Sequence, residues 1–270
     1  MTLRLTTAMR SVTGPHRASN QDSVGCSDDY VFVADGVGGH VGGDVASWTV
    51  THRLMSALAP RHSRDLDTDE LRIAIAQANA ELSLRVQREP ALAGMATTFT
   101  GLFCSDGAIR IAHIGDSRAF MVRDGAGRRM TRDDSWVQLL VDSGAIRPDE
   151  ADHHPNRNVI LRSLAGSLAD TDGMTLLSVP AQAGDRWLVA SDGLTDYLPE
   201  PQVIELLAAA ASPDDACATL VDAALAADSR DNVTVAVSDV VESQGSADRP
   251  HRYLGAAASD KPGTIGDLSR

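Results

Sequence analysis

Lysine is almost missing from this 270-residue chain, which contains a single one, Lys261. A phosphate-binding loop of the G-x-x-x-x-G-K-S/T type, a protein-kinase fold and a Schiff-base enzyme each need a lysine in the folded body. Because Lys261 falls in a C-terminal stretch without an apolar pattern, the sequence excludes these three classes. Aromatic residues are also scarce, at 4%, so we expect a core built mainly from Val, Leu, Ile and Ala.

Cysteines and long apolar runs are few as well. Cys26, Cys104 and Cys217 form an odd set with no paired spacing, so we expect buried thiols rather than disulfides or a zinc knuckle. No apolar run approaches the roughly 20 residues that span a bilayer. The first fifteen residues contain no apolar block of the kind found in a signal peptide. We therefore expect a cytoplasmic protein with no membrane partner.

Acidic residues outnumber basic ones, 37 to 24, and the formal net charge is −13. A surface of this sign repels nucleic-acid phosphates, so we expect no nucleic-acid partner. An acidic excess often serves only solubility, but carboxylates can also be gathered to hold cations.

The pattern of apolar residues predicts an α+β fold. Apolar spacing and capping residues predict helices over 44–58, from Asp67 to about Val86, over 133–144 and over 213–227. Strands are predicted at Tyr30–Ala34, Thr97–Cys104, Ile109–Ile114, Ala119–Arg123, Trp187–Ala190 and Val233–Val237. Short turns between neighbouring strands indicate antiparallel hairpins, which favours segregated helices and sheets over a doubly wound parallel sheet.

The chain divides into one domain and a tail. We expect a single domain over residues 1–240. Within it, a charged stretch of about 129–172, rich in His and broken by proline, predicts a helical flap. From 241 to 270 the sequence turns to Gly, Ser, Ala and Pro, which predicts a disordered tail.

Four aspartates lie at the ends of predicted strands. Asp35 stands in VFVADG, Asp116 in IAHIGDSR and Asp192 in WLVASDG, and Asp231 directly precedes the strand TVAV. Asp-Gly after a strand is by itself an ordinary turn signal. Four occurrences at strand ends instead indicate carboxylates that converge on one edge of a sheet, where the neighbouring glycines allow sharp turns.

Such a cluster is suited to divalent cations. Carboxylates this close resist ionisation unless a cation neutralises them. Oxygen ligands without nearby Cys or His favour Mg²⁺ or Mn²⁺ over zinc. Two cations sharing a water would lower its pKa and aim it at an electrophile. Arg17, in HRASNQD, could hold a phosphate by two parallel hydrogen bonds, although a lone arginine there is more often a solvated charge.

Several ordered motifs carry a family resemblance. They are HRASNQDS, VADGVGGHVGGDVAS, ATTFTGLF, IAHIGDSRAF, VASDGLTDYL and SRDNVTVAV. These strings, in this order, resemble the bacterial branch of the PP2C (PPM) family of metal-dependent serine/threonine protein phosphatases. The match runs from Arg17 to Val237, and the stretch from MTRDDSW to RSLAG resembles that branch's flap.

The resemblance implies a four-layer α-β-β-α sandwich and a specific ligand set for Mn²⁺ or Mg²⁺, with two core ions and a weaker third. Asp35 would bridge the two core ions, the carbonyl of Gly36 would bind one, and Asp192 and Asp231 would complete the other. Asp116 would hold the third ion together with Asp192. Phosphoserine and phosphothreonine would be hydrolysed by attack of a metal-bridging hydroxide.

Three further roles follow from the resemblance. Arg17 would bind the substrate phosphate, and Asp22 would order metal-bound water. His40 is the candidate general acid, although a histidine at a helix start could equally serve only to order the loop. The substrates would be phosphoproteins made by a serine/threonine kinase, and we expect a monomer.

One position departs from the family pattern, and two rival functions stay open. Family members commonly carry Asp five residues before the arginine, where this chain has Val12, which puts metal affinity in question. A catalytically weak phosphoprotein-binding module of the same fold is one rival. Hydrolysis of small phosphomonoesters is the other. The spacing Cys104-x5-Arg110 matches cysteine-dependent phosphatases, but the intervening residues predict a hairpin rather than a phosphate cradle.

Overall fold

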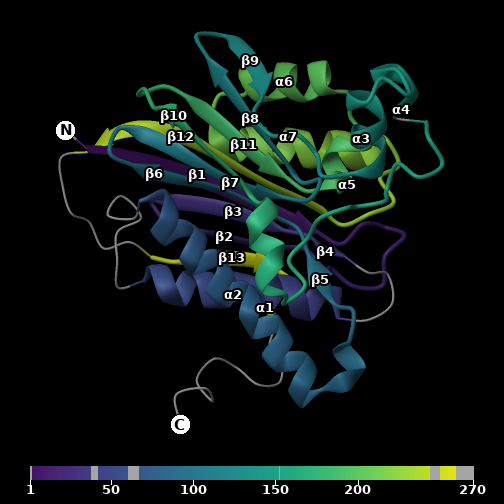
Figure 1. Cartoon of the computed structure of the whole chain (residues 1–270). Helices are drawn as coiled ribbons and strands as arrows, with labels where there is room; N and C mark the ends of the chain where they lie inside the picture. The colour runs from purple at the N-terminus through teal and green to yellow at the C-terminus, as the bar shows by residue number, and fades with distance from the viewer. Residues whose placement is uncertain (1, 38–41, 60–66, 152, 244–249, 260–270) are drawn as a thin grey trace.

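Two antiparallel sheets lie face to face, and helices cover both outer faces (Figure 1). The computed structural model describes residues 2–37, 42–59, 67–151, 153–243 and 250–259. Neighbouring strands within both sheets of the described residues run antiparallel. The predicted α+β class and the four-layer α-β-β-α sandwich are confirmed.

The strands are distributed over two large sheets and one small ribbon. The first sheet has the order β1 (Thr2–Val12), β12 (Val233–Ser243), β11 (Arg186–Ala190), β8 (Arg118–Arg123) and β9 (Ala126–Arg129). The second has the order β10 (Thr175–Pro180), β7 (Ala108–Ile114), β6 (Phe99–Ser105), β3 (Tyr30–Ala34), β2 (Ser23–Cys26) and β13 (Arg252–Gly255). The ribbon pairs β4 (Gly36–Val37) with β5 (Ala96–Thr97).

Side chains alternate across each sheet with the period of two that a β-strand imposes. In β3, Val31 and Val33 point into the layer between the sheets, whereas Tyr30 and Phe32 pack toward the helices. Because both faces are covered, β3 is apolar throughout rather than alternately polar, and all five of its residues are buried. This accounts for the continuous apolar run that identifies the strand in the sequence.

Two groups of helices cover the outer faces. The second sheet is covered by α1 (Gly43–Leu58) and α2 (Thr68–Arg88). The first sheet is covered by α5 (Asp192–Thr195), α6 (Glu200–Ala209) and α7 (Pro213–Ala226). Two of the predicted helix starts are confirmed: Asp67 forms a complete capping box with Glu70, and the Ser212 side chain caps α7. The helix predicted over 133–144 is shorter, since α3 begins at Trp136 after its cap Ser135. None of the described helices is both long and apolar enough to cross a bilayer.

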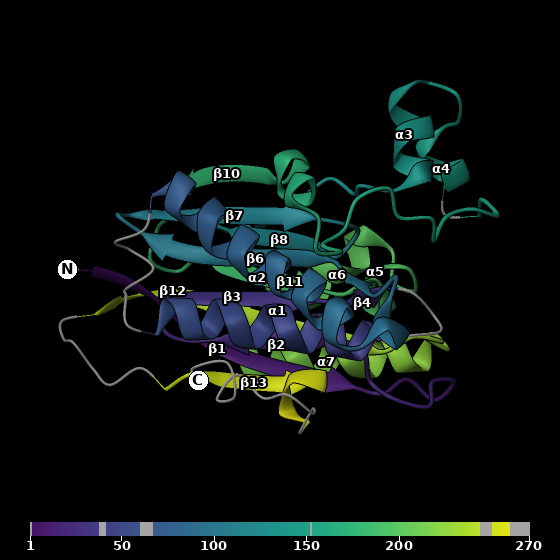
Figure 2. The ribbon, with the colours of Figure 1, turned by 60° about the horizontal axis from the view of Figure 1, so that its bottom comes forward.

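The predicted flap region leaves the sandwich as short helices. It contains α3 (Trp136–Asp142), α4 (Pro148–Ala151) and the 3₁₀ turn η3 (Leu168–Gly173). Figure 2 shows α3 and α4 projecting away from the two sheets. Isolated bridges join Ser135 to Ile160 and Leu164 to Thr97. The segment that enters the flap therefore contacts the segment that leaves it, and the latter also contacts β5.

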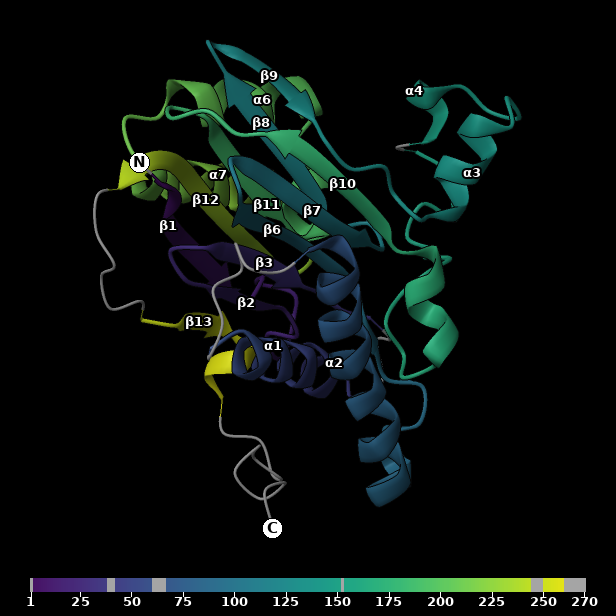
Figure 3. The ribbon, with the colours of Figure 1, turned by 60° about the vertical axis from the view of Figure 1, so that its left-hand side comes forward.

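The C-terminal region differs from the predicted disordered tail. β12 extends to Ser243, and β13 adds a sixth strand to the second sheet by pairing with β2. The 3₁₀ turns of the body are η2 (Pro90–Leu92) and η4 (Ala256–Ala258), and η4 follows β13 onto α1 (Figure 3). A four-residue strand joins a sheet through its backbone and needs no apolar periodicity, which is why the composition concealed it. We refer to residues 250–259 as the C-terminal strap.

Candidate active site at one edge of the two sheets

Asp35 follows β3 directly and is held by its backbone. Its N–H donates to Thr98 Oγ1 at 3.1 Å, and its carbonyl accepts from Thr98 N and from Thr97 Oγ1, both at 2.8 Å. Gly36 begins β4, and a Cβ there would lie 2.3 Å from the carbonyl oxygen of Gly43. Only glycine fits, so the backbone turns tightly directly after the Asp35 carboxylate.

Asp116 and Asp192 lie at the ends of neighbouring segments. Asp116 is in the turn between β7 and β8, and Asp192 opens α5 after β11. Ala190 pairs with Arg118 across these strands, which brings the two aspartates to the same edge. The Oδ1 atoms of Asp116 and Asp192 are buried and have no hydrogen-bond partner. A buried, unpaired carboxylate oxygen is costly unless a cation binds it.

Asp231 and Arg17 form an ion pair at the same edge. Asp231 directly precedes the Asn232–Val233 entry into β12, and its Oδ1 accepts from the N–H of Asn232 at 2.8 Å. Arg17 Nη2 donates to Asp231 Oδ2 at 2.5 Å, and Arg17 Nε donates to the Arg230 carbonyl at 3.1 Å. The Arg17 side chain is 40% exposed, so its guanidinium stands at the solvent side of the cluster.

Asp22 is buried beneath these residues at 1% exposure. Its Oδ2 accepts a hydrogen bond of 2.8 Å from the hydroxyl of Ser191, and its N–H donates to Asn20 Oδ1 at 3.0 Å. Ser191 is in turn fixed by the N–H of Thr234 at 3.1 Å. Asp22 is thereby linked to the residue directly before Asp192.

The electrostatics of the cluster show that these carboxyls share one poorly solvated space. Burial raises the pKa of Asp35 well above its usual range, and four neighbouring carboxylates raise it further. These neighbours are Asp22, Asp192, Asp116 and Asp231. Burial likewise raises the pKa of Asp192 well above its usual range, that of Asp22 to about 6 and that of Asp116 to about 7.

The donor set fits hard divalent cations, although the side chains are not in ligating positions. In the described part of the chain, no three His, Cys, Asp or Glu side chains are grouped so that they could hold a metal ion. Asp231 instead contacts Arg17. The unpaired oxygens of Asp116 and Asp192 and an all-oxygen donor set nevertheless match Mg²⁺ or Mn²⁺.

Two residues of the sequence interpretation remain to be placed. His40 lies outside the described residues. Val12 ends β1, pairs with Val233 and packs partly buried against the apolar cluster beneath α7. In this chain its position therefore contributes to packing on the helix side of the first sheet.

Two supporting residues were missed by the sequence interpretation. Ser191 holds Asp22, as described above. The Asn232 side chain accepts from Gln21 N at 2.8 Å and donates to the Ser19 carbonyl at 3.0 Å, which ties the segment after Arg17 to the segment of Asp231. Each missed residue is adjacent to a predicted aspartate, and that adjacency was the available signal.

Fold and site together define an α-β-β-α sandwich with an acidic, cation-compatible edge. Residues 16–228 match the family model described as protein phosphatase 2C. The chain belongs to the protein phosphatase 2C family.

Similar proteins and structures agree with this assignment. The chain is 40% identical over 250 residues to the serine/threonine protein phosphatase PstP of Mycobacterium tuberculosis, a match covering 90% of this chain and 46% of PstP. The chain thus spans about half the length of this curated relative. It is 33% identical to the serine/threonine phosphatase stp of Listeria monocytogenes, covering 84% of this chain and 92% of stp. The crystal structure of the PstP catalytic domain in complex with two manganese ions superposes with a TM-score of 0.78 at 38% identity, covering 89% of this chain and all of that one.

Proposed function

We propose that this chain is a serine/threonine protein phosphatase that hydrolyses phosphoserine and phosphothreonine. The observation that carries the proposal is the edge at which buried carboxyls meet Arg17, with unpaired oxygens on Asp116 and Asp192. The names of the similar proteins and the two manganese ions of the PstP structure support the same reaction.

The proposed ligand roles are those that the family resemblance implies. Asp35 would bridge two core ions, the Gly36 carbonyl would bind one of them, and Asp192 and Asp231 would bind the other. Asp116 and Asp192 would hold a weaker third ion. When bound, the two core ions would supply a shared hydroxide for in-line attack on phosphorus.

The remaining residues bind and orient the substrate. Arg17 would exchange its contact with Asp231 for two phosphate oxygens, and its exposed position allows that movement. Asp22, fixed by Ser191, would order water around the ions from a buried position. His40 would protonate the leaving alkoxide of the serine or threonine, and a His40→Ala substitution tests that role by its effect on substrates with poor leaving groups.

The cellular setting is part of the proposal. We place the reaction in the cytoplasm, where a monomeric enzyme would reverse the action of a serine/threonine kinase. Cys26, Cys104 and Cys217 are buried and take part in no disulfide, which suits a reducing compartment.

The first experiment measures hydrolysis of p-nitrophenyl phosphate with Mn²⁺, with EDTA and after Asp192→Ala. We expect EDTA to abolish turnover and Asp192→Ala to lower kcat by about 100-fold or more, because the ligand for two ions is lost. Asp222→Ala, at an exposed position on α7, is the matched control and should retain activity. Activity that persists in EDTA or survives Asp192→Ala would refute the metal-dependent reaction.

A phosphopeptide panel separates the rival functions. A protein phosphatase should cleave phosphoserine and phosphothreonine peptides with higher kcat/KM than small phosphomonoesters. A phosphoprotein-binding module would bind the peptides without turnover. The set of site carboxyls together with Arg17 favours turnover, whereas Val12 in place of the usual carboxylate is the one feature that favours weak activity.

A further inference from the structure

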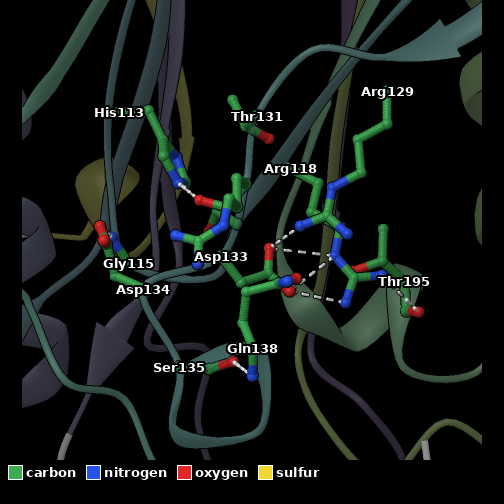
Figure 4. Close-up of polar contacts among 12 residues, drawn as sticks. His113, Gly115, Arg118, Arg129, Thr131, Asp133, Asp134, Ser135, Gln138 and Thr195 are labelled. Carbon is green, nitrogen blue, oxygen red and sulfur yellow. Dashed lines mark hydrogen bonds and ion pairs between the residues drawn. The ribbon is translucent and has the colours of Figure 1, made fainter. Parts of the chain in front are cut away.

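Three consecutive residues at the base of the flap form hydrogen bonds to both sides of the turn that contains Asp116. They are Arg132, Asp133 and Asp134, which follow β9 and precede α3. Their partners are His113 and Gly115 before Asp116, and Arg118 after it (Figure 4). We refer to these six residues as the flap-base clasp.

The first half of the clasp fixes the backbone around Gly115. His113 is fully buried, and its Nε2 lies 2.9 Å from the Arg132 carbonyl oxygen. Gly115 and Asp134 are joined twice: Gly115 N donates to Asp134 Oδ2 at 3.1 Å, and Asp134 N donates to the Gly115 carbonyl at 2.7 Å. The residue directly before Asp116 is therefore fixed at both of its backbone polar groups.

The second half is a buried ion pair. Arg118 donates from Nη2 to Asp133 Oδ2 at 2.8 Å and from Nε to both carboxylate oxygens at 3.1 and 3.2 Å. The Asp133 side chain is 7% exposed and also accepts from Arg129. Because guanidinium groups occupy both oxygens of Asp133, this carboxylate binds the two arginines rather than a metal ion.

Arg118 also contacts the turn that contains Asp192. Its Nη1 donates at 3.3 Å to the carbonyl of Thr195, the last residue of the α5 turn that Asp192 opens. Figure 4 shows the Arg118 guanidinium between Asp133 and Thr195. One side chain thus joins the turn of Asp116 to the turn of Asp192.

We propose that Arg118 and Asp133 are positioning residues that set the separation of Asp116 and Asp192 for the outer cation. This inference rests on the proposed function, because it concerns the ion those two carboxylates would share. The planar guanidinium fixes direction as well as charge, so a lysine at position 118 would not substitute for it. Residues that orient metal ligands in this way typically change metal affinity by about 10- to 100-fold when substituted.

The test is Mn²⁺ binding to the full chain by isothermal titration calorimetry, for the parent, Asp133→Asn and Arg118→Lys. We expect both variants to keep the two tighter sites and to bind the weakest ion about tenfold less tightly. In metal-free protein, hydrogen exchange of the Gly115 amide should be faster in both variants. The matched control is Asp239→Asn, which breaks a similar bidentate pair with Arg186 at the opposite end of the same sheet.

The outcomes are distinct. Binding of all Mn²⁺ ions as in the parent, together with unchanged exchange at Gly115, would overturn the positioning role. Equal weakening in Asp239→Asn would also overturn it, because the effect would then be general loss of stability. Arg118→Lys keeps the buried charge and is expected to fold if Asp133→Asn does not. A parent that binds no Mn²⁺ at all would instead overturn the proposed function.

Discussion

Two glycines allow the backbone of Asp231 to lie between its neighbours. A Cβ on Gly14 would lie 1.8 Å from the Asp231 carbonyl oxygen, and a Cβ on Gly193 would lie 1.9 Å from that of Asn232. These are contacts with backbone, which cannot rotate away as a side chain could. The segments of Arg17, Asp192 and Asp231 can approach one another only because these two positions have no side chain.

Gly193→Ala should therefore disturb the site more than its size suggests. We expect a lower melting temperature, by about 5 °C or more, and weaker Mn²⁺ binding, because the Asp192 and Asp231 segments must separate. Differential scanning fluorimetry and calorimetric titration measure the two effects. Gly107→Ala is the control: its Cβ would meet nothing within 4 Å, so it reports only the cost of a positive φ. Equal effects of the two substitutions would contradict this explanation.

At this scale the sequence revealed the ends of strands better than the contacts between them. Asp35, Asp116 and Asp192 were recognisable because each follows an apolar run and lies beside a turn. The contacts of Arg17 with Asp231 and of Ser191 with Asp22 could not be recognised in the sequence, because each joins segments far apart in the chain. Such contacts depend on how the two sheets pack, which local patterns do not specify.

Among the elements, the C-terminal strap makes contacts that its composition did not predict. Trp48 Nε1 donates to the Ser259 carbonyl at 3.0 Å, and His52 Nε2 lies 2.9 Å from the Ala257 carbonyl. Ala256 N donates to the Asp22 carbonyl at 2.6 Å, so the strap reaches the backbone of a site residue. The strap thus continues the second sheet and covers one side of α1.

A chain ending at Ser243 should be less stable than a chain ending at Ser259. Without the strap, the edge of β2 loses its partner and the side of α1 that carries Trp48 and His52 is uncovered. We therefore expect a melting temperature several degrees lower and more binding of an apolar dye. The chain ending at Ser259 is the matched control, since it lacks only residues 260–270. Identical melting of the two chains would show that the strap contributes nothing to stability.

The helices and the strap illustrate what could be predicted at this scale. α1, α2 and α7 have amphipathic spacing, and two of them have side-chain caps, so their positions followed from the sequence. β13 and the two-residue strands β4 and β5 are too short to show a period. They exist because a neighbouring strand offers backbone partners, which is a property of the assembled sheet.

Across the whole molecule, the carboxyls of the site make stability depend on pH and cations together. Folded-state pKa values of about 6 for Asp22 and about 7 for Asp116 exceed the value of about 3.9 for an unfolded aspartate. Between these values the metal-free folded protein binds more protons than the unfolded chain. Its free energy of unfolding therefore receives a contribution that falls as pH rises from about 4 to about 7.

Mn²⁺ should reverse that contribution, because it binds the ionised carboxylates. We expect the rise in melting temperature on adding Mn²⁺ to grow by several degrees between pH 5.5 and pH 7.5, measured against EDTA at each pH. Burial lowers the pKa of His113, His52 and His251, but these groups titrate in both samples and cancel in the difference. Asp116→Asn should flatten the pH dependence. A Mn²⁺ effect that is constant or shrinks over this range would contradict the assigned cluster.

The pairing of β1 with β12 also sets how much of the described chain must be synthesised before the candidate site can form. β1 is the first strand of the chain, and its partner in the sheet runs from Val233 to Ser243. Arg17 follows β1 and Asp231 precedes β12, so Arg17 and Asp231 come into contact only when these two strands pair. For the proposed phosphatase, synthesis must therefore proceed through β12 before the candidate site can form, so a translation product that stops before β12 should lack the proposed activity.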